Sequence, residues 1–170
     1  MNTYNKSRGF SLIELMVTIV VMAILASVAV PNFQSWLRNT QIRNAAESVT
    51  NGLQRARAEA VSRNTNVTFV LGADSSWTLN VVAPASTIEQ RLAAEGSKNV
   101  TRTVLPATSS TVTFNNVGLV ATTNADGTAP ITQVDFAATG GNQPLRVTIG
   151  TGGNAKMCDP ALPSSNPRGC

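Results

Sequence analysis

"RGFSLIELMVTIVVMAILASVAVP" spans residues 8–31, and the only charged side chain after Gly9 in this stretch is that of Glu14. A helix over residues 10–31 is about 33 Å long at 1.5 Å per residue, which matches the hydrocarbon core of a bilayer. Basic residues precede Gly9, and basic flanks of a membrane helix stay in the cytoplasm. We therefore predict a single-pass membrane helix with its N-terminus in the cytoplasm and the rest of the chain on the opposite side.

Two interpretations of the N-terminal processing of this stretch are possible. In the first, a secretory signal would be cleaved after the small residues Ala-Ser-Val-Ala at 26–29, releasing a soluble binding module. Glu14 argues against it, because a carboxylate disturbs the apolar core of such a signal. The helical pattern also continues past this site. In the second, a peptidase cuts after Gly9, where the missing side chain lets the enzyme approach the backbone closely. We favour the second interpretation.

The composition excludes several kinds of function. The chain has 170 residues, 13% of them charged, and a formal net charge of +4, too small a bias to indicate nucleic-acid binding by itself. The sequence contains no histidine, no phosphate-binding glycine motif and no HExxH motif. The segment NADGT (124–128) resembles part of a calcium loop without the later glutamate, so it predicts a turn. We expect no enzyme activity, no catalytic residue, no bound metal and no cofactor.

Cys158 and Cys170 are the only cysteines of the sequence, and both lie near the C-terminus. Two cysteines without a histidine do not make a zinc site. Their close spacing, in a chain with an export-type N-terminus, favours a disulfide formed in an oxidising compartment, with unpaired thiols as the alternative. The disulfide would close a loop over residues 158–170, which holds three prolines that stiffen it.

Residues 32–64 continue the helix with an amphipathic pattern. Apolar side chains recur at spacings of mostly three or four residues, at Phe33, Leu37, Ala45, Val49, Leu53, Ala56 and Ala60. Opposite charges lie four residues apart in the pairs Arg43 and Glu47, Arg55 and Glu59, and Glu59 and Arg63. We interpret the charged face as solvated and ion-paired rather than as a nucleic-acid surface. The whole helix over residues 10–64 would be about 80 Å long at 1.5 Å per residue.

Residues 65–170 alternate between strand and turn patterns. The segments 66–71 and 76–83 predict a hairpin, and further strands are expected at 100–105, 111–114, 119–123, 131–138, 145–150 and 155–158. Residues 86–96 open with a capping-box pattern, Ser86 to Glu89, and predict a short helix or an ordered loop. An antiparallel β-sheet with one face on the apolar stripe of the helix would complete an α+β fold.

The octapeptide RGFSLIEL (8–15) resembles the class III signal of type IV prepilins and type II secretion pseudopilins. The resemblance implies that a prepilin peptidase removes a leader, residues 1–9, by cutting after Gly9, and then methylates the new N-terminal residue, Phe10. It also implies a type IV pilin-like fold. In that fold the long helix has a membrane-spanning half (10–31) and an amphipathic half (32–64), and it packs on the β-rich domain.

The acidic residue of that family falls on Glu14, and its helix-bending proline falls on Pro31. A proline removes a helix hydrogen bond, so Pro31 would kink the helix near the membrane surface. An unpaired charge is strongly penalised among packed apolar helices. We therefore hypothesise that Glu14 pairs with the N-terminal amine of Phe10 on a neighbouring subunit, which would fix the register of assembly.

Softer motifs extend the resemblance to the GspH/FimT branch of this family. They are ARAEAVSRNTNVTFV (56–70), TFNNVGLV (113–120) and LRVTIGTGGNAKMC (145–158). The branch implies a minor pilin that helps initiate or cap assembly of a type IV pilus. An H-type minor pseudopilin of a type II protein secretion system is the alternative. The C-terminal cysteine pair resembles pilus subunits more than pseudopilins, and such a loop is often a subunit or ligand contact.

A FimT-like, DNA-binding minor pilin of natural transformation is a further alternative. Its candidate residues are Arg146, Lys156 and Arg168, with Lys98 and Arg102 as more distant ones. Phosphate binding needs clustered basic groups, whereas these are scattered along the sequence, and Trp77 is expected in the core rather than stacked on a base. The chain also has NVGL and GTGGN where the family often has a basic glycine–arginine turn.

The partners that the resemblance implies are the inner membrane, the prepilin peptidase, other major and minor pilins or pseudopilins, and an inner-membrane assembly platform. DNA is a partner only in the DNA-uptake alternative. The protein would first reside in the inner membrane, with its N-terminus cytoplasmic and its C-terminal domain periplasmic. It would then move into the tip of a pilus or pseudopilus.

Overall fold

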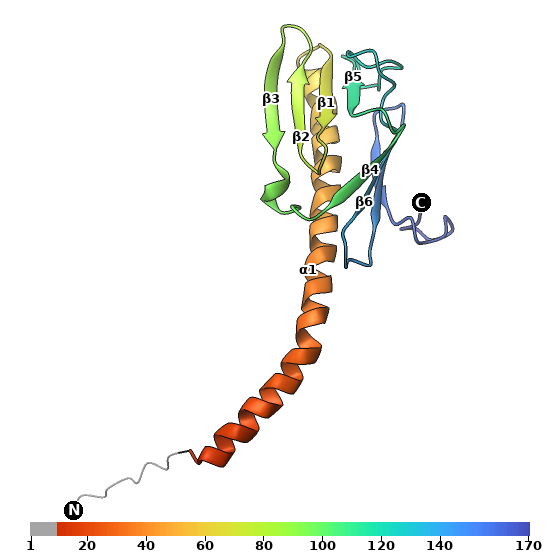
Figure 1. The fold of residues 1–170 in the computed structure, drawn as a ribbon. Helices are drawn as coiled ribbons and strands as arrows, with labels where there is room; N and C mark the ends of the chain where they lie inside the picture. The colour runs from red at the N-terminus through yellow and green to blue at the C-terminus, as the bar shows by residue number, and fades with distance from the viewer. Residues whose placement is uncertain (1–9) are drawn as a thin grey trace, which may run out of the picture.

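A computed structural model describes residues 10–170, in which one long helix, α1 (Leu12–Ser62), carries a β-rich head on its C-terminal half (Figure 1). The N-terminal half of α1 extends beyond the head (Figure 1). The expected leader, residues 1–9 with its last residue Gly9, lies outside the described residues. The expected helix is confirmed, because Leu12–Ser62 falls two residues inside the predicted range at each end.

Pro31 does not interrupt α1, which continues as one helix through this residue. The N-terminal half curves smoothly away from the axis of the packed half, without the sharp kink expected from the sequence (Figure 1). The side chain of Asn32 donates a hydrogen bond to the carbonyl oxygen of Val28 (2.9 Å), one turn earlier. A side-chain donor thus serves the helix backbone next to the proline, which has no N–H of its own.

The described residues form eight strands in two four-stranded antiparallel sheets, where the sequence had suggested one sheet. The first sheet has the order β3-β2-β1-β5, with β1 (Val67–Leu71), β2 (Trp77–Val81), β3 (Ser86–Arg91) and β5 (Thr111–Phe114). The second has the order β4-β6-β7-β8, with β4 (Thr101–Leu105), β6 (Gln133–Ala137), β7 (Leu145–Ile149) and β8 (Ala155–Cys158). Alternation along a strand indicates its buried face, but strand pairing depends on residues distant in sequence.

The strand β3 corrects the prediction of a short helix or loop at residues 86–96. Its backbone pairs with β2, so that Glu89 lies opposite Leu79. Only a short 3-10 helix, Ala93–Glu95, follows this strand before Gly96 turns the chain with φ at 123°. The Ser86-to-Glu89 pattern therefore caps no helix, because pairing with the neighbouring strand satisfies the backbone groups that a cap would serve.

The predicted strand at 119–123 is also wrong. Val120 makes only an isolated bridge with Phe114. The N–H of Val120 donates to the carbonyl oxygen of Thr151 (3.0 Å), whereas the N–H of Ala121 donates to that of Thr113 (2.8 Å). Successive backbone groups bond to different segments, so no ladder forms with a single partner strand.

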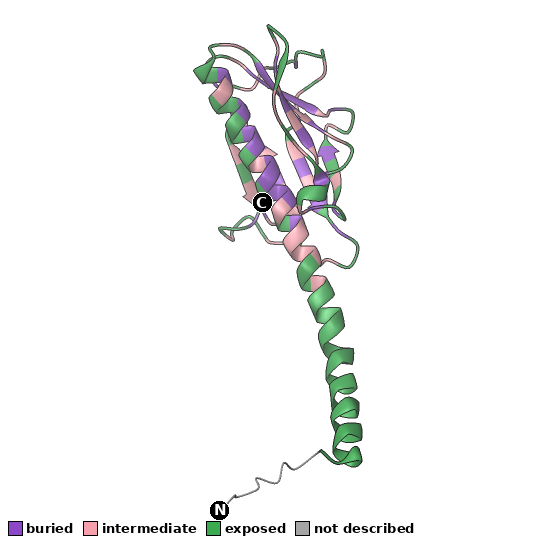
Figure 2. Cartoon of the chain, turned by 90° about the vertical axis from the view of Figure 1, so that its left-hand side faces the viewer, coloured by how far each residue is buried: buried purple, intermediate pink, exposed green. Residues whose placement is uncertain are grey.

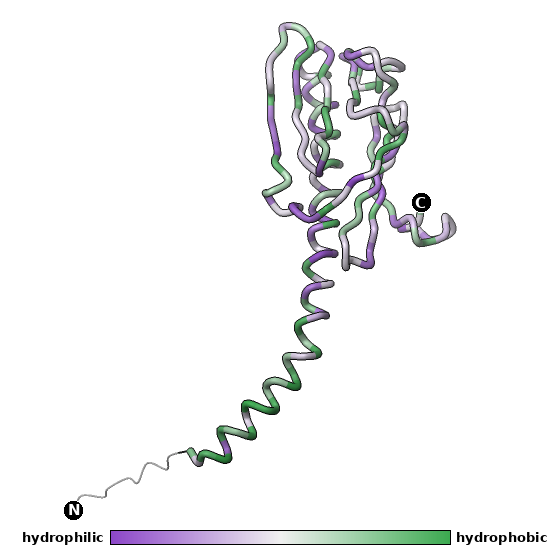
Figure 3. Tube along the Cα trace, in the orientation of Figure 1, coloured by the Kyte–Doolittle hydropathy of each residue, from purple (hydrophilic) through white to green (hydrophobic). Residues whose placement is uncertain are grey.

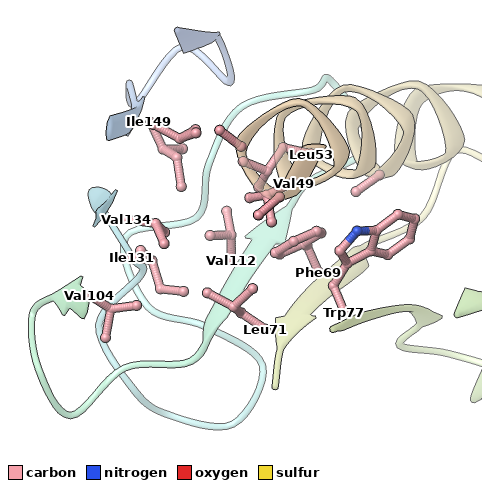
Figure 4. Close-up of a cluster of buried hydrophobic side chains, with 14 of the residues drawn as sticks. Val49, Leu53, Phe69, Leu71, Trp77, Val104, Val112, Ile131, Val134 and Ile149 are labelled. Atoms are coloured by element: carbon pink, nitrogen blue, oxygen red, sulfur yellow. The ribbon is translucent and has the colours of Figure 1, made fainter. Parts of the chain in front are cut away.

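The hydrophobic core lies where α1 meets both sheets (Figure 4). Val49 and Leu53 of the helix lie close to Phe69 and Trp77 of the first sheet, and Val134 and Ile149 of the second sheet are buried in the same cluster. Trp77 is 4% exposed and donates its indole N–H to the hydroxyl of Ser48 (2.8 Å). The predicted core position of Trp77 is therefore confirmed, and its polar atom has a partner.

The apolar stripe of the helix is covered over only part of its predicted length. Burial begins at Ile42 and extends to Ala60, and Figure 2 shows this change along the helix. Phe33 is 61% exposed and Leu37 44% exposed, so the expectation that the sheet covers them is wrong. The uncovered half is the more hydrophobic part of α1 (Figure 3), and α1 is long and apolar enough to cross a membrane.

Gly52 marks the closest approach between α1 and the first sheet. A β-carbon at this position would lie 2.8 Å from a ring carbon of Phe69 and 3.0 Å from one of Trp77. The glycine lowers the intrinsic stability of the helix, but its missing side chain lets two aromatic rings pack against the helix backbone.

We expect Gly52→Ala to lower the free energy of unfolding by about 1 kcal/mol. Overpacking costs roughly 1–3 kcal/mol, and the better helix propensity of alanine offsets about 1 kcal/mol of it. Urea unfolding of the full chain in detergent micelles, followed by tryptophan fluorescence, measures the change. Asn51→Ala is the matched control. Asn51 is exposed, so an alanine there raises the helix propensity without a steric clash. Equal stabilisation of both variants would contradict the packing explanation.

Candidate functional site

The N-terminal end of α1 is held by a capping box formed by Ser11 and Glu14. The hydroxyl of Ser11 accepts a hydrogen bond from the backbone N–H of Glu14 (3.2 Å), and the Glu14 carboxylate accepts one from the N–H of Ser11 (3.3 Å). A carboxylate in the first turn also interacts favourably with the helix dipole. The sequence analysis missed this local role of Glu14, although the S-x-x-E spacing of residues 11–14 is its usual signal.

Glu14 forms no ion pair within residues 10–170. Phe10 lies directly before the cap and is 90% exposed. The Glu14 carboxylate is thus held at the backbone N–H of Ser11, the residue that follows Phe10 in the chain. This geometry can present one negative charge to a cation on another molecule while α1 stays capped.

The charged face of α1 is ion-paired as predicted. Arg43 Nε lies 2.8 Å from Glu47 Oε1, and Arg63 Nε lies 2.7 Å from Glu59 Oε2. Arg55 pairs with Glu59 and also with Glu89 of β3, at 3.8 Å and 3.0 Å. These exposed pairs contribute little stability each, but they neutralise much of the basic face.

Of the DNA-binding candidates, Arg146 is already paired. Its guanidinium makes a two-pronged contact with Asp135 on the neighbouring strand β6, at 2.6 Å and 3.0 Å. The hydrogen bonds that Arg146 donates to the Asp135 carboxylate raise the pKa of Arg146 above its ordinary value. Lys156 is exposed on β8, opposite Thr148, and Arg168 lies in the C-terminal loop. The pairing of Arg146 leaves no cluster of unpaired cations on this sheet within the described chain.

The two more distant candidates differ from each other. Arg102 on β4 donates from Nε to the carbonyl oxygen of Gly72 (2.6 Å), and partial burial lowers its pKa despite the nearby Asp74. It therefore joins the two sheets rather than facing a ligand. Lys98 is exposed in the loop before β4.

The glycine turns NVGL (116–119) and GTGGN (150–154) lie against one side of Arg57 of α1, whose side chain remains exposed. Gly118 and Gly153 have φ of 80° and 78° and lie against each other, so a β-carbon at Gly153 would collide with the Gly118 carbonyl oxygen. A β-carbon at either position would also lie 3.1 Å from Nε of Arg57. Nothing local in the sequence predicted this neighbour, because the contact joins the helix to two separate turns.

The NADGT segment forms a turn, as predicted. Asn124 is buried, and its side chain accepts from the N–H of Thr113 and donates to the carbonyl oxygen of Thr111, each at 2.9 Å. Asp126 accepts from both the N–H and the hydroxyl of Thr128, and these hydrogen bonds lower its pKa. Residues 10–170 contain no group of three or more side chains suited to hold a metal ion.

Cys158 and Cys170 are joined by a disulfide in the structure. The loop they close folds back on itself, because the N–H of Asp159 donates to the carbonyl oxygen of Arg168 (2.7 Å). A pocket of about 460 Å³ lies between this loop and α1, with Trp36 and Arg43 among the helix residues that line it. The disulfide thus holds Arg168 near the helix, at the end of the head from which the uncovered half of α1 emerges.

Comparisons with protein families match two parts of the chain. The prokaryotic N-terminal methylation motif matches residues 4–30, and the type II transport protein GspH family matches residues 45–161, more than half of the chain. A fimbrial protein of Pseudomonas aeruginosa is 37% identical over 54 residues, which are 32% of this chain and 34% of that protein. The chain therefore spans about a third of the length of that curated relative.

Two solved structures have a similar fold. The type IV minor pilin FimU of Pseudomonas aeruginosa matches with a TM-score of 0.50 and 21% identity, over 75% of this chain and 98% of that one. The minor pseudopilin EpsH from the type 2 secretion system of Vibrio cholerae matches with a TM-score of 0.54 and 13% identity, over 72% and 99%. At these identities the likeness establishes the type IV pilin-like fold, and both structures share one long helix packed on antiparallel sheets.

We expect Thr128→Val to raise the pKa of Asp126. The hydrogen bonds of Thr128 favour the ionised carboxylate in the folded state. Asp126 therefore stabilises the fold above the pKa of an unfolded aspartate, about 3.9, and this contribution disappears as the pH falls through the lower folded pKa. In the Thr128→Val variant, the Asp126 carboxylate should titrate at a higher pH. The free energy of unfolding of this variant should fall less on acidification than that of the wild type.

Carbon NMR of the Asp126 carboxyl and urea unfolding between about pH 6 and pH 3 measure the two effects. Thr122→Val is the control, because Thr122 is exposed in the same loop and makes no hydrogen bond to Asp126. An unchanged titration in Thr128→Val would show that Thr128 does not set this pKa.

Proposed function

This chain belongs to the GspH family of type II transport proteins, and from this premise we propose that it is a minor pilin that helps initiate or cap a type IV pilus. The observation that carries the proposal is the uncovered half of α1. From Leu12 to Leu37 its large apolar side chains are exposed, although the head buries the following residues. Such a surface needs lipid before assembly and neighbouring apolar helices afterwards.

The proposed maturation is cleavage after Gly9 by a prepilin peptidase, followed by N-methylation of Phe10. The match to the N-terminal methylation motif supports it. The start of α1 at Leu12 and the high exposure of Phe10 are also consistent with it, because the new terminus would directly precede the helix cap. The mature chain would reside in the inner membrane with its head in the periplasm until an assembly platform moves it into the filament.

Glu14 is proposed to set the register of the subunit in the filament. Among packed apolar helices its charge requires a partner, and the N-terminal amine of Phe10 on a neighbouring major or minor pilin has the opposite charge. The capping box keeps the carboxylate at the first turn of α1 in each subunit. Only a neighbour displaced by the correct step along the helix axis would place its amine beside this carboxylate.

The type II secretion pseudopilus remains the second candidate, and the match to the GspH family supports it. The C-terminal disulfide loop, which resembles pilus subunits, favours the pilus. DNA uptake has less support, because Arg146, one of its three candidate residues, is paired with Asp135. Pilus assembly and protein secretion can be measured separately after deletion of the gene.

We expect the mature protein to have the mass of residues 10–170 plus one methyl group. Intact-mass and peptide spectrometry of the membrane-extracted protein measures this mass. A Gly9→Leu variant is the control and should retain the leader, because a side chain at this position blocks the close approach of the peptidase. A wild-type protein that begins after Ala29 would instead indicate an ordinary secretory signal.

Glu14→Ala and Glu14→Gln are both expected to reduce the incorporation of this subunit into pili by tenfold or more. Each variant removes the charge, whereas Glu14→Gln keeps an acceptor for the N–H of Ser11 and so retains much of the cap. The measurements are the amount of this protein and of the major pilin in sheared pili of a complemented deletion strain.

Ser11→Ala is the matched control, because it weakens the capping box and keeps the charge of Glu14. The Ser11→Ala variant should assemble normally if the register depends on the proposed ion pair between Glu14 and the Phe10 amine of a neighbouring subunit. Normal assembly of Glu14→Gln would contradict the register proposal. A deletion strain with normal pili and impaired protein secretion would favour the pseudopilus.

A further inference from the structure

The membrane-proximal end of the head lies at the level of lipid headgroups, if α1 spans the bilayer as in the proposed function. At 1.5 Å per residue, Trp36 lies about 39 Å and Arg43 about 50 Å along the helix from Phe10. A bilayer is about 40–45 Å thick including its headgroup regions, and curvature of α1 reduces the distance along the membrane normal. The segment from Trp36 to Arg43 therefore falls in or just outside the headgroup region on the side of the head.

The side chains at this level are of the kinds that anchor proteins at membrane interfaces. Phe33 and Trp36 are 61% and 59% exposed, and their rings pack with centroids 5.7 Å apart. Aromatic side chains, tryptophan above all, are enriched where the hydrocarbon meets the headgroups. The head leaves this aromatic pair uncovered, so its exposed faces are available to lipid.

After Glu14, charged side chains resume at the same level. Residues 15–37 contain no charged side chain, and the first two that follow are Arg38 and Arg43. Arg38 forms no ion pair within residues 10–170. Arg43 contacts Glu47 through Nε, which leaves its terminal amino groups for another acceptor.

The pocket of about 460 Å³ opens between this part of α1 and the C-terminal loop. Trp36, Asn39 and Arg43 line it from the helix, and Met157 and Arg168 line it from the opposite side. Asp159 also lines it, but its carboxylate accepts a hydrogen bond from the N–H of Ala161 (2.9 Å) within the loop. The pocket therefore combines an aromatic and apolar surface with the side chains of two arginines and one aspartate, which leaves a net positive charge, and the neighbouring disulfide fixes the loop that carries Arg168.

We propose that this pocket binds the phosphate of an anionic phospholipid in the membrane leaflet next to the head. Arg43 and Arg168 would contact the phosphate, while Trp36 and Met157 would contact the glycerol and upper acyl chain. Lipid is the occupant that both the depth and the charge of the pocket favour. The bound lipid would hold the head close to the membrane surface before assembly, and this inference rests on the proposed membrane residence of the chain.

The test uses the full chain in lipid nanodiscs of equimolar phosphatidylglycerol and phosphatidylcholine. Native mass spectrometry measures which lipid stays bound after the disc is removed. An arginine near a lipid surface contributes about 1 kcal/mol, so we expect each of Arg43→Gln and Arg168→Gln to reduce the preference for phosphatidylglycerol about fivefold. Arg43→Lys should retain most of the preference, because it keeps the charge.

Arg63→Gln is the matched control, because Arg63 is the C-cap residue of the same helix, at the far end of the head, and its ion pair with Glu59 resembles that of Arg43 with Glu47. It should leave the lipid preference unchanged. Equal retention of the two lipids by the wild type, or equal loss of preference in Arg63→Gln, would overturn the proposal. Equal retention together with reduced filament incorporation of Arg168→Gln would assign the pocket to a neighbouring subunit instead.

Fluorescence quenching measures the depth independently. Trp36 and the buried Trp77 are the only tryptophans of the chain, so the difference between wild type and Trp36→Phe isolates Trp36. Quenchers at the headgroup level should act more strongly on it than quenchers deep in the acyl chains. The reverse order would overturn the depth argument. If the lipid test fails while the Glu14 variants still reduce incorporation into pili, the proposed filament function stands and only the lipid proposal is overturned.

Discussion

The structure depends on one helix that meets two different environments along its length. The β-rich head covers α1 from Ile42 to Ala60, where small residues such as Ala45 and Gly52 let both sheets approach the helix backbone. From Leu12 to Leu37 the large apolar side chains are exposed, and contacts with the head begin around Trp36 and Asn39. A single continuous helix can therefore be fixed rigidly in a folded domain and still present an apolar surface to lipid or to other subunits.

This division gives each part of the chain a distinct task. The head, with its own core and two sheets, can fold outside the membrane, because the residues that cover α1 all belong to the same domain. In the proposed filament, the uncovered half would supply the lateral contacts, and Glu14 at its end would add one charged group that depends on the position of a neighbour. Stability of the subunit and geometry of the filament would then be encoded in different parts of one helix.

The distribution of charge follows the same division. On the head, several basic side chains are occupied by carboxylates, as in Arg63 with Glu59 and Arg146 with Asp135. At the end of the head next to the uncovered half of α1, Arg38 has no ionic partner in the described chain, and the disulfide loop brings Arg168 close to the helix. In the proposed membrane-bound state these cations would face phosphate groups, whereas the paired charges elsewhere on the head leave fewer cations for nucleic acid.

Features that depend only on residues close together in the chain could be predicted from the sequence. These include the length of α1, the ion pairs four residues apart, the hairpin of β1 and β2, the NADGT turn and the N-terminal processing motif, since helix periodicity, strand alternation and turn chemistry are local. The tertiary structure decided which strands pair, so residues 86–91 became β3 despite their capping-box pattern. It also decided that Asp135 neutralises Arg146 and that Arg168 faces the pocket beside Arg43. These contacts join residues far apart in sequence, and only the packed core brings them together.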